Sequence, residues 1–265
     1  MKICKYLLPI MAISLITNEL YSQSNREKSD AAVMDRRSFL IGGYNEIKED
    51  SNFGLVFAGP RINYGMIWNW TNEKYLITYE FGLGTEILFS HEIPALGFYL
   101  KPIQTAYLFN LPGTLNNLYI GPSFTMEYQY NLYPDLQSGF DYWFTDFNLG
   151  IDVQCNIEFK RSVFNLKLIS SLIGVTSRTS EYRNPYFYDI GFNYAVRHLH
   201  EGFGFGTIGS FNSTSFEILW KSINPSRIAV GYMFQYSGYF NTPEISLISN
   251  SLKLVFSKKS KSHET

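Results

Sequence analysis

The sequence is short of cysteine, of charged residues and of long apolar runs. It holds two cysteines in 265 residues, and charged residues make up 17% of the chain, below the roughly 25% that is usual in soluble domains. No run of about 18 apolar residues follows the N-terminal segment, so no membrane-spanning helix is expected. The formal net charge of −1 provides no basic surface for nucleic acid. These deficits exclude a disulfide-rich domain, a helical membrane protein and a nucleic-acid-binding protein.

The N-terminal segment has the features of a secretory signal peptide. Lys2 and Lys5 precede an apolar core over residues 6–17, and a cleavage site follows Ser22. We therefore expect a signal peptide over residues 1–22. A periplasmic lead-in over 23–37, a folded domain over 38–257 and a C-terminal tail over 258–265 complete the expected organisation. The mature chain would keep one cysteine, Cys155, which excludes an intramolecular disulfide.

The segment from Asp146 to Lys160 alternates strictly between apolar and polar residues. Side chains on a strand point alternately to opposite faces, so this pattern predicts a strand with one apolar face. The segment is much longer than the about 5–6 residues of an ordinary strand. It is long enough to cross an outer membrane at a tilt, which takes about 9–11 residues.

Similar alternation predicts ten strands in all. The connections after the second, fourth, sixth and eighth strands are short, whereas the others tend to be longer, which is typical of barrels with short periplasmic turns. The expected fold class is all-β, a single closed antiparallel transmembrane β-barrel of about ten strands, with eight or twelve as alternatives. A β-bulge is expected at Lys101-Pro102, where the alternation breaks. The predicted strands cover residues 38–46, 54–70, 75–89, 96–110, 118–132, 142–160, 163–176, 211–221, 227–239 and 246–257.

With its signal peptide, amphipathic strands and aromatic-ended last strand, the chain resembles the small outer-membrane β-barrel proteins of Gram-negative bacteria. Leu252, Leu254 and Phe256 are the outward positions of that last strand. The resemblance implies a location in the bacterial outer membrane, contact with its lipids, and recognition of the C-terminal strand by the barrel assembly machinery. Tryptophan prefers the membrane interface, and the aromatic residues expected there are Trp68, Trp70, Trp143 and Trp220.

If the apolar side chains face lipid, the polar side chains of the same strands face the lumen. Acids and bases are nearly balanced in this expected lumen network, and charges held away from water must pair. We therefore expect a closed or very narrow lumen. A wide porin is not expected, because open channels need about 16 strands. The expected lumen network consists of Arg61, Glu80, Glu86, Lys101, Glu127, Asp146, Asp152, Glu158, Lys167, Glu217, Lys221, Arg227 and Lys253.

The function expected from this pattern is a structural, adhesive or small-solute role exerted through the external loops. The aromatic-rich loop 177–210 is the expected contact surface for an extracellular ligand. One alternative is an outer-membrane-embedded hydrolase of lipid or peptide with its active site at the outer rim. Another is a soluble periplasmic lipid-binding barrel with apolar side chains turned inward. The sequence assigns no catalytic residue, metal site or cofactor, and favours a protein that is not an enzyme.

Overall fold

The computed structural model describes residues 33–50, 54–111, 118–134, 141–178, 191–222, 227–240 and 244–257. The predicted signal peptide 1–22, the lead-in as far as residue 32, and the tail 258–265 lie outside the described residues. The chain divides into a unit Met1–Val33 and a unit Met34–Thr265, and the second unit contains the fold.

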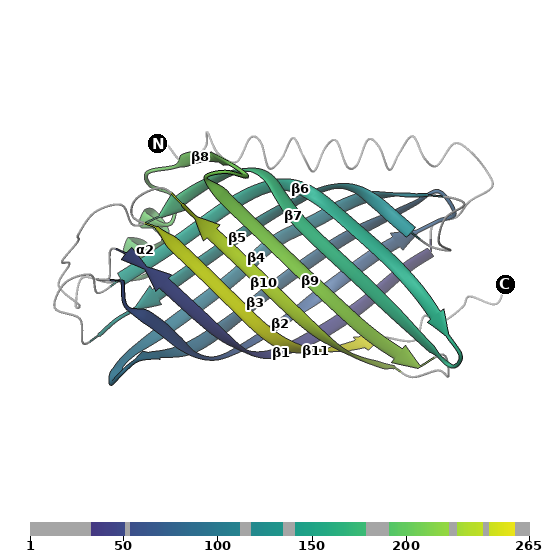
Figure 1. Cartoon of the computed structure of the whole chain (residues 1–265), viewed down its shortest axis with the longest axis horizontal. Helices are drawn as coiled ribbons and strands as arrows, with labels where there is room; N and C mark the ends of the chain where they lie inside the picture. Colours follow the sequence, from purple (N-terminus) through teal and green to yellow (C-terminus); the bar gives the residue numbers. More distant parts are fainter. Residues whose placement is uncertain are drawn as a thin grey trace. The chain divides into compact units, whose positions relative to one another are not determined.

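Within the described ranges, ten long antiparallel strands close into a barrel (Figure 1). Consecutive strands pair around the ring, β7 pairs with β9, and the pairing of β1 with β11 closes it. The short strand β8 (Gly204–Thr207) pairs with β7 outside the ring, and the helix α2 (Phe192–His198) precedes it. The ring strands are β1 (Val33–Glu49), β2 (Val56–Thr71), β3 (Tyr75–Ser90), β4 (Ile93–Asn110), β5 (Leu118–Leu132), β6 (Asp141–Phe159), β7 (Ser162–Arg178), β9 (Phe211–Ser222), β10 (Ile228–Tyr239) and β11 (Ile245–Ser257).

The predicted barrel of ten strands is confirmed, and most strand ends agree within a few residues. The largest difference is β1, which begins at Val33 rather than at residue 38. The residues 33–37 carry no clear alternation, so the sequence pattern contains no signal for this extension. The predicted bulge is also present, since the register between β4 and β5 shifts between Leu100 and Ile103.

The bulge changes which residues of β4 face the lumen. Before it, odd-numbered residues such as Ala95 and Lys101 are buried, whereas after it the even-numbered residues Gln104 and Ala106 are buried. An extra residue in one strand produces this switch of side-chain direction. The bulge therefore allows Lys101 and Gln104, three residues apart, to point to the same side.

Along its middle section the barrel wall is apolar outside and polar inside. On β6, Leu149 and Ile151 are 51% and 39% exposed, whereas Asp146, Asn148 and Asp152 are buried. The apolar faces predicted from the alternation thus point outward. We call the outward apolar side chains of the ring strands the lipid belt. This is the arrangement of a barrel surrounded by hydrocarbon. A soluble lipid-binding barrel requires the reverse arrangement.

No helix in the described part of the chain is long and apolar enough to cross a membrane.

The interior is layered along the barrel axis. We call the end where β1 begins and β11 finishes the periplasmic end, following the rule that short turns face the periplasm, and the opposite end the outer end. Buried apolar side chains fill both ends, and buried polar side chains lie between them. The apolar cluster at the outer end, called the outer plug, contains Ile47, Phe57, Leu88, Ala95, Tyr133, Tyr142, Phe144, Phe211, Tyr239 and Ile245. The periplasmic end holds Phe39, Ile41, Leu219, Met233 and Val255 in one cluster, and Leu76, Ala106, Leu108 and Tyr119 in another.

Candidate functional site: the filled lumen

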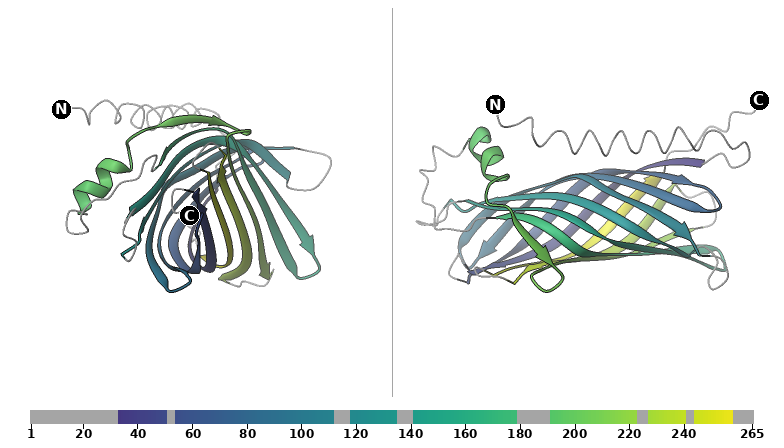
Figure 2. Two further views of the ribbon diagram at one scale, coloured as in Figure 1. Left: turned by 60° about the vertical axis from the view of Figure 1, so that its left-hand side comes forward. Right: turned by 90° about the horizontal axis from the view of Figure 1, so that it is seen from above.

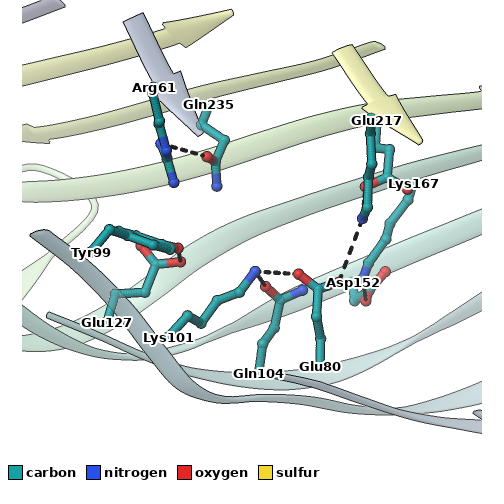
Figure 3. Close-up of polar contacts among 11 residues, drawn as sticks. Arg61, Glu80, Tyr99, Lys101, Gln104, Glu127, Asp152, Lys167, Glu217 and Gln235 are labelled. Carbon is teal, nitrogen blue, oxygen red and sulfur yellow. Dashed lines mark hydrogen bonds and ion pairs between the residues drawn. The ribbon is translucent and has the colours of Figure 1, made fainter. Parts of the chain in front are cut away.

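Three acids and three bases meet in the lumen toward the periplasmic end, and we call them the ion cluster (Figure 3). Lys253 Nζ donates to Glu217 Oε2 over 2.6 Å and lies 3.7 Å from Glu80 Oε2. Lys101 Nζ pairs with Glu80 and donates to Gln104 Oε1 over 2.7 Å. The members of the ion cluster are Glu80, Lys101, Asp152, Lys167, Glu217 and Lys253.

The register of the sheet explains how Lys253 reaches Glu217 across an intervening strand. Lys253 on β11 is paired with Gly231 on β10, and Gly231 is paired in turn with Leu219 on β9. A glycine at the middle position contributes no side chain, so the lysine can extend past β10 toward β9. A Cβ at Gly231 would press on the Leu219 side chain and on the Ile218 carbonyl oxygen.

A second pair completes the ion cluster on the other side of β9. Lys167 Nζ lies 3.9 Å from Asp152 Oδ2, and Lys167 on β7 is paired in register with Glu217 on β9. Apart from Lys167, which is half-buried, all members of the ion cluster are buried. Because three positive and three negative groups are enclosed together, the cluster is neutral when all are ionised, as buried charges require.

Arg61 organises a second polar group closer to the outer end. Its Nη1 lies 3.4 Å from acceptors on Asn45, Gln235 and Ser249, and its guanidinium lies 4.3 Å from the centre of the Tyr99 ring. Tyr99 in turn donates its hydroxyl to Glu127 over 2.9 Å. We call this group, with Glu86 and Asp146, the Arg61 cluster.

The two remaining acids of the Arg61 cluster are held by side-chain amides. Glu86 accepts hydrogen bonds from Asn45 and, over 2.9 Å, from Gln129. Asp146 accepts a hydrogen bond from Asn148. A cavity of about 20 Å³ lies among these residues, which is room for about one water molecule. Protein side chains therefore fill the lumen around the Arg61 cluster, apart from this small cavity.

The two clusters contain ten of the charged residues that the sequence places in the lumen. The other three differ: Glu158 and Arg227 are exposed near the periplasmic end, and Lys221 is half-buried close to the end of β9. These three residues share the inward-facing alternation of their strands, but they lie beyond the enclosed section of the barrel. The uncharged partners Asn45, Tyr99 and Gln129 were missed by reasoning that followed charge alone, although they share the inward parity.

The four tryptophans occupy different environments. Trp220 is 46% exposed at the end of β9, and Trp68 and Trp70 are half-buried at the end of β2. Trp143 departs from the predicted interface position because it is only 1% exposed. His198 on α2 lies against it, with the centres of the two rings 5.2 Å apart.

The described histidines lie in separate local contacts rather than in one metal-binding or hydrolytic group. His198 is buried, and its Nδ1 lies 2.8 Å from the Tyr194 carbonyl oxygen. His91 lies in the turn between β3 and β4 with a positive φ of 54°. Asp189 lies outside the described residues. Among the residues that are described, no group of three or more His, Cys, Asp or Glu side chains could hold a metal ion.

A closed antiparallel barrel with an apolar outer face and enclosed charges inside defines an integral outer-membrane β-barrel protein. The protein is therefore located in the bacterial outer membrane.

Comparisons with known proteins gave similarity in three dimensions alone, since no family model and no curated protein sequence matches the chain. It is similar to the outer membrane protease OmpT from Escherichia coli, at 9% identity and a TM-score of 0.44, covering 88% of this chain and 99% of that one. It is similar to the translocator domain of the autotransporter NalP from Neisseria meningitidis, at 8% identity and a TM-score of 0.43, covering 92% and 95%. The β domain of the Bordetella autotransporter BrkA gives 9% identity and a TM-score of 0.45, covering 86% and 100%.

Proposed function

We propose that this protein is a non-conducting outer-membrane barrel with a structural or adhesive role, exerted at its outer end. The observation that carries this proposal is the filled lumen. The ion cluster and the Arg61 cluster occupy the middle of the barrel, and the cavity lined by the Arg61 cluster, of about 20 Å³, is too small for a solute larger than water.

The outer plug supports the same conclusion. It draws side chains from strands all around the ring, including Phe57 on β2 and Phe211 on β9. Phe57 and Tyr133 pack with ring centres 4.5 Å apart. Apolar side chains enclosed together at a mouth exclude water and ions, because an ion there would lose its hydration without gaining a partner. This arrangement favours a scaffold over a small-solute channel.

Conductance of the refolded protein in a planar lipid bilayer tests the proposal. We expect no single-channel current from preparations whose folded state is verified by heat-modifiable migration on a gel. A wide porin measured in parallel is the positive control. Steady single-channel currents would contradict the proposal. A change in the ion selectivity of such currents in the Glu80→Gln variant would identify the lumen as the path.

The adhesive and structural roles differ in a second measurement. Residues 179–190, which belong to the connection between β7 and α2 and lie outside the described residues, can be replaced by a short Gly-Ser linker. An adhesive role predicts that cells producing this variant lose adherence while their outer membrane stays resistant to detergent. A structural role predicts that adherence does not depend on the segment, and that loss of the whole barrel increases sensitivity to detergent.

A further inference from the structure

The connection between β7 and β9 forms a separate layer on the outside of the barrel. We call residues 192–210, which include α2, β8 and the turn that follows β8, the external arm (Figure 2). Backbone pairing attaches it to β7, with Gly204 opposite Thr176 and Thr207 opposite Ile173. The Ser177 hydroxyl donates to the carbonyl oxygen of Glu201. The external arm is therefore fixed to the outer face of the wall.

Aromatic contacts attach the external arm to two further strands. Tyr128 on β5 forms a 3.1 Å hydrogen bond with His200 Nε2. Phe147 on β6 stacks on Phe203, with ring centres 5.5 Å apart and planes 29° apart. Tyr128 and Phe147 have the outward parity of their strands. The external arm thus occupies part of the surface that lipid would otherwise cover.

The external arm also presents apolar side chains of its own. Phe203, Phe205 and Ile208 are 38%, 66% and 53% exposed. Such large exposed apolar groups close together on one short segment indicate a contact surface.

The register of the strands shows which residues of the lipid belt these side chains lie beside. Phe205 is opposite Val175, and Val175 is opposite Phe147 on β6. Thr207, the residue before Ile208, is opposite Ile173, which is opposite Leu149. The exposed apolar residues of the external arm therefore lie two strands along the ladder from Phe147 and Leu149, which are outermost in the lipid belt on β6, and they extend that belt onto β8.

The polar part of the external arm lies farther out. His198 on α2 contacts Trp143, which precedes Phe147 toward the outer end of β6. The Arg197 side chain is exposed and forms an ion pair with Glu201 at 2.9 Å. A segment that holds apolar residues in one part and charged residues in another is typical of a membrane interface. There the apolar side chains enter the acyl region of the lipids and the charged ones stay in the headgroup region.

We propose that the external arm is docked on the outer leaflet of the membrane. Acyl chains of the lipids contact Phe205 and Ile208, and α2 lies at the level of the headgroups. The continuity with the lipid belt identifies lipid as the occupant of this surface. The proposal does not depend on whether the lumen conducts, so each can fail without the other.

Fluorescent probes at single cysteines measure the position of the external arm. A polarity-sensitive fluorophore is attached to the Phe205→Cys variant in a Cys155→Ser background, and the protein is placed in phosphatidylcholine nanodiscs, which expose both faces to solution. We expect lipids with brominated acyl chains to quench this probe as strongly as a probe in the lipid belt at Leu149→Cys. Iodide in the buffer should quench it as weakly as that reference.

The exposed residue Asn193 on α2 provides the matched control. A probe on Asn193→Cys should show the reverse pattern, with strong quenching by iodide and weak quenching by brominated lipid. The Ile208→Cys variant repeats the measurement in case Phe205→Cys does not fold, as judged by heat-modifiable migration. If the probes at both positions behave like the Asn193 probe, the surface faces water and a soluble partner, and the proposal is overturned.

Discussion

Replacing Lys253 with methionine should destabilise the barrel by about 3–5 kcal/mol, the typical cost of removing one partner from a buried ion pair. Lys253 is 1% exposed, and its ammonium group donates to Glu217 over 2.6 Å. It also lies 4.7 Å from the centre of the Phe39 ring. Methionine keeps most of the packing volume, so the loss of stability measures the effect of removing the charge. Glu80 keeps its pair with Lys101, and the cost therefore falls mainly on Glu217.

The companion substitution Glu217→Gln separates the charge from other effects of the change. When Lys253 is already methionine, removing the carboxylate relieves the uncompensated buried charge. The double variant should therefore be more stable than the sum of the two single losses predicts. Residues in one buried network show interaction energies of roughly 0.5–3 kcal/mol in such cycles.

Urea unfolding of the protein folded into phosphatidylcholine vesicles, followed by tryptophan fluorescence, measures these differences in the free energy of unfolding. The control is Arg227→Met, which removes an exposed base that the sequence placed in the same network. Substitution of an exposed residue should stay within about 0.5 kcal/mol of the wild type. The reasoning is refuted if Lys253→Met costs no more than Arg227→Met, or if the effects at positions 253 and 217 simply add.

Two other predictions concern steric fit and burial. Gly65→Val should abolish heat-modifiable folding, because a Cβ at this position meets the Phe39 ring and a backbone carbonyl. Gly42→Val is the control and should fold normally, because a Cβ at Gly42 meets no atom within 4 Å. Equal folding of the two variants would show that the close contact at Gly65 is not needed. Cys155, a buried free cysteine, should react slowly with a water-soluble maleimide in the folded barrel and rapidly after unfolding in urea; equal rates in the two states would contradict its burial.

The strands were predictable because a transmembrane barrel imposes a strict local rule on its sequence. Each ring strand has lipid on one side and enclosed polar groups on the other, so residues alternate over its whole length. This signal is present on β6 without any knowledge of the neighbouring strands. It also places Lys101 and Glu80 on the inward side before any partner is known.

The partners within the lumen were not predictable from the same rule. Parity shows that Lys253 faces inward, but its contact with Glu217 depends on register across three strands and on the missing side chain at Gly231. The same dependence explains the prediction for Trp143. Its place near the outer end of β6 favoured the membrane interface, and its burial results from a separate segment of the chain.

The sequence by itself predicted about ten long strands, each with one apolar and one polar face, because these features follow from alternation along single strands. The tertiary structure fixed the number at ten and showed that the apolar faces point outward. Only the tertiary structure decided which charges pair, where apolar side chains fill the mouth, and that the external arm lies against the outside of β5, β6 and β7. Those features join residues far apart in the chain, and the closure and register of the barrel determine which of them meet.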